Sequence, residues 1–142
     1  MSEPLTPARS PRYAAPLRAC DEVAAVAEGD VLRVSGITRI RAGGPYLAGH
    51  FPEITIFPGV FTMEAVVQAV VQSLGERNGQ IARLCTVRSL RLLVPLYPGD
   101  ELSFEACVAN PASAEAVVVT AEGRRGDGVR VATMTLECGW SP

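Results

Sequence analysis

The sequence predicts a single α+β domain in which an antiparallel β-sheet wraps around one long buried helix. Two observations lead to this fold class. Strand-like segments lie on both sides of one apolar helical segment, and turn signals separate the later strands at hairpin spacing. The 142 residues, 48% of them hydrophobic, are enough for one core. We therefore expect one domain over residues 17–142, preceded by a flexible Pro-rich arm at residues 1–16.

The first part of the domain has the pattern of a β-hairpin. Strand-like residues occupy 17–27 and 31–40, and Glu28-Gly29-Asp30 between them supplies turn chemistry. Alternation in the second strand divides its side chains into two faces, one with Val31, Arg33, Ser35, Ile37 and Arg39 and the other with Leu32, Val34, Gly36, Thr38 and Ile40.

A helix is expected from Pro58 to about Leu74, with Gly75 as its C-terminal stop. Apolar residues spread around most of its circumference, so we expect it to have no contact with water. A narrow polar stripe remains at spacing i, i+4, i+8, formed by Glu64, Gln68 and Gln72. After the helix, four further strands are predicted as a meander, at 84–96, 101–109, 116–122 and 129–138.

Composition excludes several classes of function. The net charge of -2 and the lack of a basic cluster argue against nucleic acid as a partner. All 13 positive residues are arginine, which excludes Schiff-base chemistry and a P-loop lysine. With one histidine and no close cysteine pair, we expect neither a metal nor another cofactor. The four cysteines are expected to be small buried hydrophobes: Cys20, Cys85, Cys107 and Cys138.

No signal peptide or stretch long enough to span a membrane is visible, so a cytoplasmic location is expected.

Residues 41–58 contain too many glycines and prolines for a regular element, yet they are rich in apolar side chains. Long structured loops of this kind are usually functional.

The chain here resembles a known family. Gly49-His50-Phe51-Pro52, Ile56-Phe57-Pro58-Gly59-Val60, and Glu64-Ala65 with Gln68 are similar to the signature of the FabZ-type 3-hydroxyacyl-acyl-carrier-protein dehydratases. The spacing of fourteen residues from His50 to Glu64 also matches. Later residues continue the likeness, which covers about residues 13–105: Arg91-Leu92, Pro95 and Pro98-Gly99-Asp100-Glu101-Leu102. The resemblance implies the hot-dog fold, which agrees with the predicted sheet around one helix.

The resemblance implies that a (3R)-3-hydroxyacyl thioester on an acyl carrier protein loses water to give the trans-2-enoyl thioester. His50 suits removal of the C2 proton, because imidazole titrates near neutral pH. Glu64 suits protonation of the departing hydroxide, since burial favours the protonated carboxyl. A backbone N–H of Gly59 or Val60 at the helix N-terminus would polarise the thioester carbonyl. Gln68, one turn after Glu64, is expected to hold its carboxyl by a hydrogen bond.

The family's sites combine histidine and acid from opposite protomers, so the resemblance implies a homodimer or a larger assembly of dimers. Candidates for lining an acyl tunnel are Phe57, Phe61, Leu93 and Tyr97, although Tyr97 also fits an ordinary strand aromatic. Leu93 and Val94 stand where the family commonly has basic residues for docking the acidic carrier protein. Other arginines are candidates for this docking, namely Arg83, Arg88 and Arg91, with Arg124 and Arg125 as a second patch.

Two other functions remain open at this point. A hot-dog acyl thioesterase would use a carboxylate to activate water and would need no histidine. A non-catalytic acyl-binding subunit would keep the fold and act in a heteromeric dehydratase with a second protein. The sequence also leaves open whether the reaction serves fatty acid or polyketide biosynthesis.

Overall fold

The computed structural model describes residues 19–41, 56–111 and 115–140, so the predicted arm at residues 1–16 and the loop residue His50 lie outside the described residues. The elements in chain order are β1 (Glu22–Glu28), β2 (Val31–Arg39), α1 (Gly59–Leu74), β3 (Glu76–Arg77), β4 (Gln80–Ile81), β5 (Arg83–Leu92), β6 (Glu101–Ala109), β7 (Ala116–Arg125) and β8 (Arg130–Gly139).

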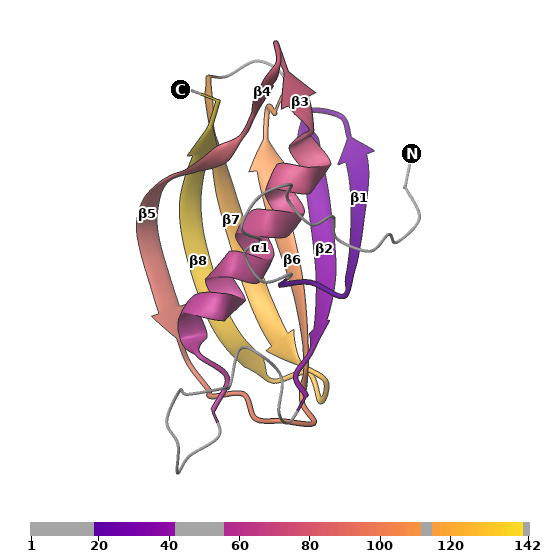
Figure 1. Ribbon diagram of the computed structural model, residues 1–142, viewed down its shortest axis with the longest axis vertical. Helices are drawn as coiled ribbons and strands as arrows, with labels where there is room; N and C mark the ends of the chain where they lie inside the picture. The colour runs from indigo at the N-terminus through magenta and orange to yellow at the C-terminus, as the bar shows by residue number, and fades with distance from the viewer. Residues whose placement is uncertain (1–18, 42–55, 112–114, 141–142) are drawn as a thin grey trace.

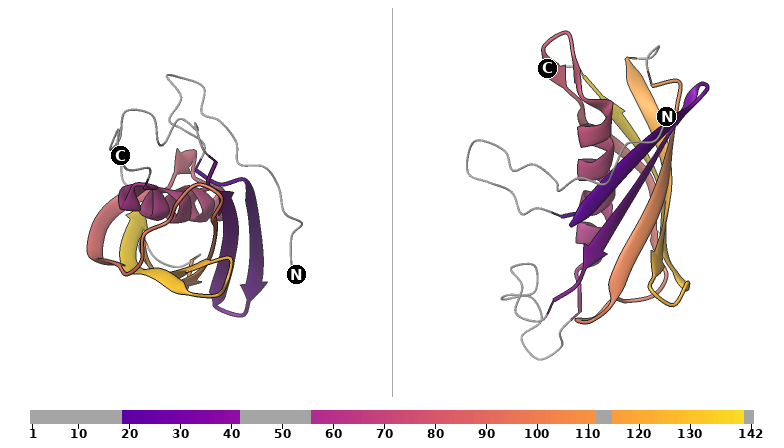
Figure 2. Two further views of the ribbon diagram at one scale, coloured as in Figure 1. Left: turned by 90° about the horizontal axis from the view of Figure 1, so that it is seen from below. Right: turned by 90° about the vertical axis from the view of Figure 1, so that its right-hand side faces the viewer.

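Six strands form one antiparallel sheet in the order β1-β2-β6-β7-β8-β5. The predicted opening hairpin is confirmed, with Gly29 in the left-handed region at φ 59°. The predicted four-strand meander is wrong in one respect. β5 does not pair with β6 but lies at the far edge beside β8, while β6 pairs with β2. The sheet thus closes around the helix from both sides, as Figure 2 shows in the view from below.

The helix lies against the inner face of this sheet, as predicted (Figure 1). It begins at Gly59 after Pro58 and ends at Leu74, and the C-cap residue Gly75 has a φ of 70°, which suits a glycine. Its inner side consists of small and β-branched residues that pack close to the sheet, namely Thr62, Ala65, Val66, Val67, Ala69 and Val70. On the sheet, the alternation predicted for β2 is confirmed, because its inner residues Val34, Gly36 and Thr38 are buried and Arg33 and Arg39 are exposed.

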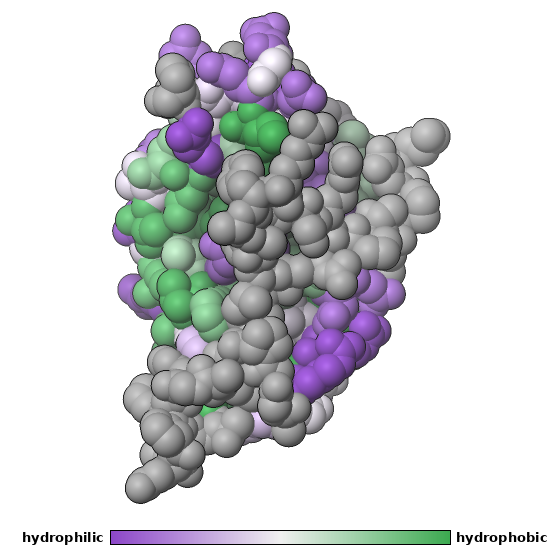
Figure 3. Space-filling model, viewed as in Figure 1, coloured by the Kyte–Doolittle hydropathy of each residue, from purple (hydrophilic) through white to green (hydrophobic). Residues whose placement is uncertain are grey.

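The expectation that the helix has no contact with water is wrong for the single chain. Val60 is 53% exposed, and Glu64 is half-buried. The reason is that the sheet covers only one side of the helix. Near the helix N-terminus, the opposite side stays open next to β5, where Leu92 is 54% exposed. Figure 3 shows apolar side chains gathered along this side of the molecule, over β5 and the first half of α1.

β5 is an irregular edge strand. Its pairing with β8 is shifted twice, between Leu84 and Thr86 and between Val87 and Ser89. Cys85 lies in the first of these irregularities and is exposed, so the expectation that all four cysteines are buried is wrong. Cys20 and Cys138 are buried as expected, and Cys107 is half-buried.

Candidate active site

The first backbone N–H groups of α1 are available as hydrogen-bond donors. The first N–H groups of any helix lack partners within it, and no side chain caps this end. Phe61 N–H is bonded, since it donates to Pro58 O at 2.9 Å. The first two helical amides are those of Gly59 and Val60, the residues predicted to polarise a thioester carbonyl.

The segment that enters the helix is fixed to the chain after β5. Phe57 forms an antiparallel bridge with Leu96, and its N–H donates to Leu96 O at 2.8 Å. The Phe57 ring packs edge-on against Phe61, with 5.9 Å between the ring centroids. These contacts hold the first turn of α1 in one position relative to the sheet edge.

A cavity of about 250 Å³ lies between the helix N-terminus and residues 92–96. Of the residues predicted to line an acyl tunnel, Phe57 and Leu93 line this cavity, whereas Phe61 and Tyr97 are not among its lining residues. Leu92 packs so closely onto Gly59 that a Cβ added at this glycine would lie 2.2 Å from Leu92 Cδ1. Glycine at this position therefore admits the Leu92 side chain.

Glu64 and Gln68 are in contact on the polar stripe of the helix. Gln68 Nε2 donates to Glu64 Oε1 at 3.1 Å. Gln68 Oε1 accepts a second hydrogen bond from the backbone N–H of Ala19, at 2.9 Å. The carboxyl of Glu64 is thus held by a side chain that is itself held by the segment before β1. The sequence indicated the first contact through the i, i+4 spacing, but it missed the second.

His50 was predicted to be the partner of Glu64, and it lies outside the described residues.

Among residues 19–41, 56–111 and 115–140, no three His, Cys, Asp or Glu residues gather closely enough to hold a metal ion. No helix in the described part of the chain is both long and apolar enough to cross a membrane.

The candidate docking arginines lie along β5 and are all exposed. Arg88 reaches across to β8 and pairs with Glu137 at 3.1 Å. Arg91 lies opposite Thr133, and Arg83 opposite Gly139, and no ion pair within the described chain engages either of them.

The second arginine patch is different, because acidic groups already neutralise it. Arg124 pairs with Glu122, and Arg125 pairs with Asp127 at 2.8 Å. Of these candidate arginines, the ones without an ion pair in the described chain are therefore Arg83 and Arg91 on β5.

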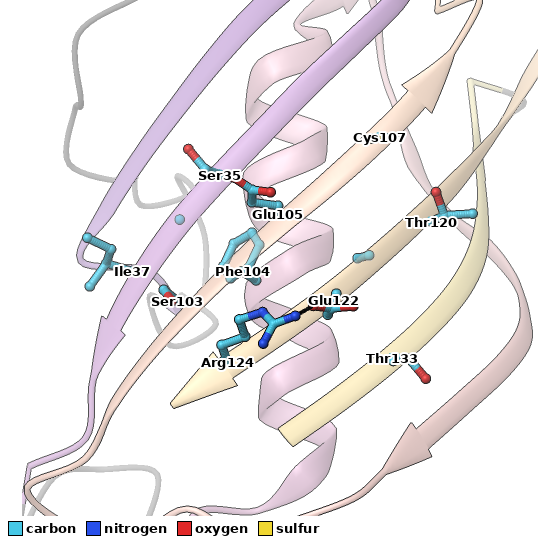
Figure 4. Close-up of a pocket in the computed structure, with 12 residues that line it drawn as sticks. Ser35, Ile37, Ser103, Phe104, Glu105, Cys107, Thr120, Glu122, Arg124 and Thr133 are labelled. Atoms are coloured by element: carbon cyan, nitrogen blue, oxygen red, sulfur yellow. Dashed lines mark ion pairs between the residues drawn. The ribbon is translucent and has the colours of Figure 1, made fainter. Parts of the chain in front are cut away.

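A larger hollow, of about 750 Å³, lies on the outer face of the sheet, away from the helix (Figure 4). Polar side chains from four strands line it, including Ser35, Glu105, Thr120 and Thr133. Figure 4 shows the Arg124–Glu122 ion pair within it. It contains neither the helix N-terminus nor Glu64, so the smaller cavity is the one that adjoins the predicted chemistry.

Known proteins resemble this chain over most of its length. The ApeI-like family, described as ApeI dehydratase, matches residues 28–125. The chain belongs to this family. A 3-hydroxyacyl-acyl-carrier-protein dehydratase FabZ of Geobacillus thermodenitrificans is 33% identical over 86% of this chain and 78% of its own length. The corresponding FabZ of Oceanobacillus iheyensis is 28% identical over 86% and 81%, and that of Thermus thermophilus is 37% identical over 56% and 59%.

Solved structures support the fold alone. A hot-dog-like protein from Thermanaerovibrio acidaminovorans has a TM-score of 0.62 at 16% identity, covering 75% of this chain and 78% of its own. A thioesterase superfamily member from Thermus thermophilus has a TM-score of 0.63 at 15% identity, covering 78% and 81%. The predicted hot-dog fold and the predicted membership of a FabZ-type dehydratase family are both confirmed.

Proposed function

We propose that this chain converts a (3R)-3-hydroxyacyl thioester, carried on the phosphopantetheine of an acyl carrier protein, into the trans-2-enoyl thioester and water. The observation that carries the proposal is the Gln68-held carboxyl of Glu64, about one and a half helical turns beyond the free N-terminus of α1. The dehydratase family of the chain supports this reading of the site. The proposal does not distinguish fatty acid from polyketide substrates.

In the proposed reaction, the imidazole of His50 takes the proton from C2 of the acyl chain. The electron pair of that C–H bond forms the C2=C3 double bond, and the C3–O bond breaks. Glu64 gives its proton to the departing hydroxide, which leaves as water. The backbone N–H groups of Gly59 and Val60 stabilise the negative charge that develops on the thioester oxygen by donating hydrogen bonds to it. The helix dipole adds to this stabilisation. The ionised Glu64 and the protonated His50 then exchange a proton, which restores both groups.

The proposal includes a second copy of the chain at the β5 edge. Among the described residues, β5 pairs with β8 alone, so the backbone groups on its other side are open to pairing. β5 itself carries the exposed apolar side chains Val87 (43%) and Leu92 (54%), and Val60 of α1 is 53% exposed. A contiguous apolar side of this kind is typical of an interface between subunits. A different protein with a similar edge would fit the same surface in a heteromeric dehydratase.

Carrier-protein docking is proposed on the outer side of β5. Arg83 and Arg91 offer charge that no described carboxylate neutralises, and a carrier protein is acidic. We keep the cytoplasmic location as a prediction from the sequence.

Mass spectrometry of a 3-hydroxyacyl-carrier substrate tests the function directly. Wild-type protein should produce a species lighter by one water, and His50→Ala and Glu64→Gln should each lose at least about 100-fold of the rate. Glu76→Gln is the matched control, since Glu76 is exposed beyond the other end of the helix and should keep full activity.

Two results would overturn the proposal for the isolated chain. One is release of free acid without dehydration, which is the thioesterase outcome. The other is an inactive wild-type protein that turns over only when a second subunit is added. Size measurement in solution accompanies both experiments, and Val87→Asp should shift a dimer toward the monomer.

A further inference from the structure

A series of hydrogen bonds connects strand β2 to the carboxyl of Glu64. Thr38 Oγ1 donates to the backbone oxygen of Ala19 at 2.6 Å. The N–H of Ala19 donates to Gln68 Oε1 at 2.9 Å, and Gln68 Nε2 donates to Glu64 Oε1 at 3.1 Å. In Figure 1, the chain entering β1 starts beside the middle of α1, which is the place where these bonds form.

The position of Ala19 is fixed from two sides. Thr38 is a buried polar residue, 5% exposed, on the inner face of β2. From the helix side, the thiol of Cys20 donates to Ala65 O at 3.0 Å. The N–H and C=O of Ala19 belong to different peptide groups, so Thr38 acts on Gln68 by fixing where residue 19 lies. Ala19 is itself 2% exposed, so its carbonyl would have no water to replace Thr38.

The donor and acceptor of each hydrogen bond determine which carboxyl oxygen of Glu64 is bonded to Gln68. The N–H of Ala19 is only a donor, so the oxygen of the Gln68 amide must face it. The nitrogen of that amide then faces Glu64 and donates to Oε1. In a neutral carboxyl the carbonyl oxygen is the better acceptor, so Oε1 takes the carbonyl role. If Glu64 carries the proton that the proposed reaction requires, that proton lies on Oε2, the oxygen that Gln68 does not engage.

We propose that Thr38 is a positioning residue for Glu64: through Ala19 and Gln68 it fixes the carboxyl so that its proton lies on Oε2. This inference rests on the proposed role of Glu64 as the acid. It adds the residue on β2 and the backbone of Ala19, neither of which touches the reacting atoms.

Steady-state kinetics test the positioning role. Thr38→Val replaces the hydroxyl by a methyl of similar size, and we expect kcat to fall about tenfold with KM changed less than twofold. Thr38→Ser should restore kcat to within about threefold of wild type, because it keeps the hydroxyl. Thr135→Val on β8 is the matched control and should leave kcat unchanged.

A double variant separates positioning from general destabilisation. In the Gln68→Ala background the connection to Glu64 is already broken, so Thr38→Val should cause no further loss of kcat. Losses that multiply in the double variant, or an equal loss in Thr38→Ser and Thr38→Val, would overturn the inference.

Amide hydrogen exchange by NMR tests the bonds without any turnover. Thr38→Val and Gln68→Met should each accelerate exchange of the Ala19 amide at least about tenfold, while amides in the middle of α1 keep their protection. Gln68→Met serves the test if Thr38→Val does not fold. Unchanged exchange at Ala19 overturns the inference whatever the activity. If the two variants accelerate exchange of the Ala19 amide but the wild-type protein shows no dehydration, the proposed function is wrong while the hydrogen-bonded connection from Thr38 to Glu64 is supported.

Discussion

Gly36 on β2 leaves room for the ring of Phe104, and we predict that Gly36→Ala destabilises the fold. A Cβ at this position would lie 2.3 Å from Cζ and 2.6 Å from Cε2 of that ring. Carbon atoms in contact normally stay about 3.5–4.0 Å apart, so the ring would have to retreat by roughly 1 Å. Phe104 is 2% exposed and belongs to the core, so a displaced ring would disturb the packing of its neighbours. Overpacking of this kind costs about 1–3 kcal/mol.

Thermal and urea unfolding followed by circular dichroism would measure this cost. For a domain of this size, the loss corresponds to a decrease in Tm of roughly 3–12 °C. Gly126→Ala is the matched control, since the nearest atom to its added Cβ is 3.8 Å away. It should change the free energy of unfolding by less than about 1 kcal/mol. In a Phe104→Leu background, Gly36→Ala should cost clearly less. An undiminished cost in that background, or a cost equal to that of Gly126→Ala, would refute the reasoning.

Two further predictions concern the cysteines and the single tryptophan. Burial raises the pKa of the Cys20 thiol to about 12 and that of Cys138 to about 11, while Cys85 is exposed. Iodoacetamide at pH 8 should therefore modify Cys85 in the native protein and reach the other two only in urea, as counted by mass spectrometry. Unfolding frees both buried thiols to ionise, so stability should fall as pH rises from about 9 toward 11. The Arg77 guanidinium lies 3.6 Å from the centre of the Trp140 ring, so Arg77→Met should lower the free energy of unfolding by about 1–2 kcal/mol and change the tryptophan emission.

Local pattern predicted most of the elements. The bounds of the helix and of β6 were predicted closely, because Pro58, Gly75 and the Pro98-Gly99-Asp100 turn mark their ends. β1 begins at Glu22, later than expected, because Ala19 and Cys20 bind the helix and β2 instead of entering the sheet. The position of β5 was missed because alternation tells which face a residue takes and not which strand lies beside it.

The β3–β4 hairpin was also missed, because two strands of two residues each carry too little alternation to stand out. The exposure of Cys85 follows from the irregular pairing of β5, which the sequence does not show.

In the candidate site, the sequence indicated the contact between Glu64 and Gln68 but not the bond from Ala19, which is 49 residues from Gln68. One signal could have pointed to it. Thr38 stands among apolar side chains on the inner face of β2, and a buried hydroxyl needs a hydrogen-bond partner. The nearest hydrogen-bond partner for this hydroxyl is the backbone that lies beside β2, and that backbone belongs to the segment before β1.

The proposed chemistry and the proposed dimer depend on the same surface. A carboxyl that donates a proton works best where water is excluded, yet in the single chain Glu64 is half-buried and Leu92 beside the helix N-terminus is 54% exposed. A second copy at the β5 edge would cover these exposed apolar side chains and remove water from the carboxyl at the same time. A change that prevents this contact should therefore reduce dehydration even when every residue around Glu64 is intact. Val87→Asp, on β5 and away from the hydrogen bonds to Glu64, would separate these two requirements: a monomer with wild-type kcat would show that one chain suffices for the reaction.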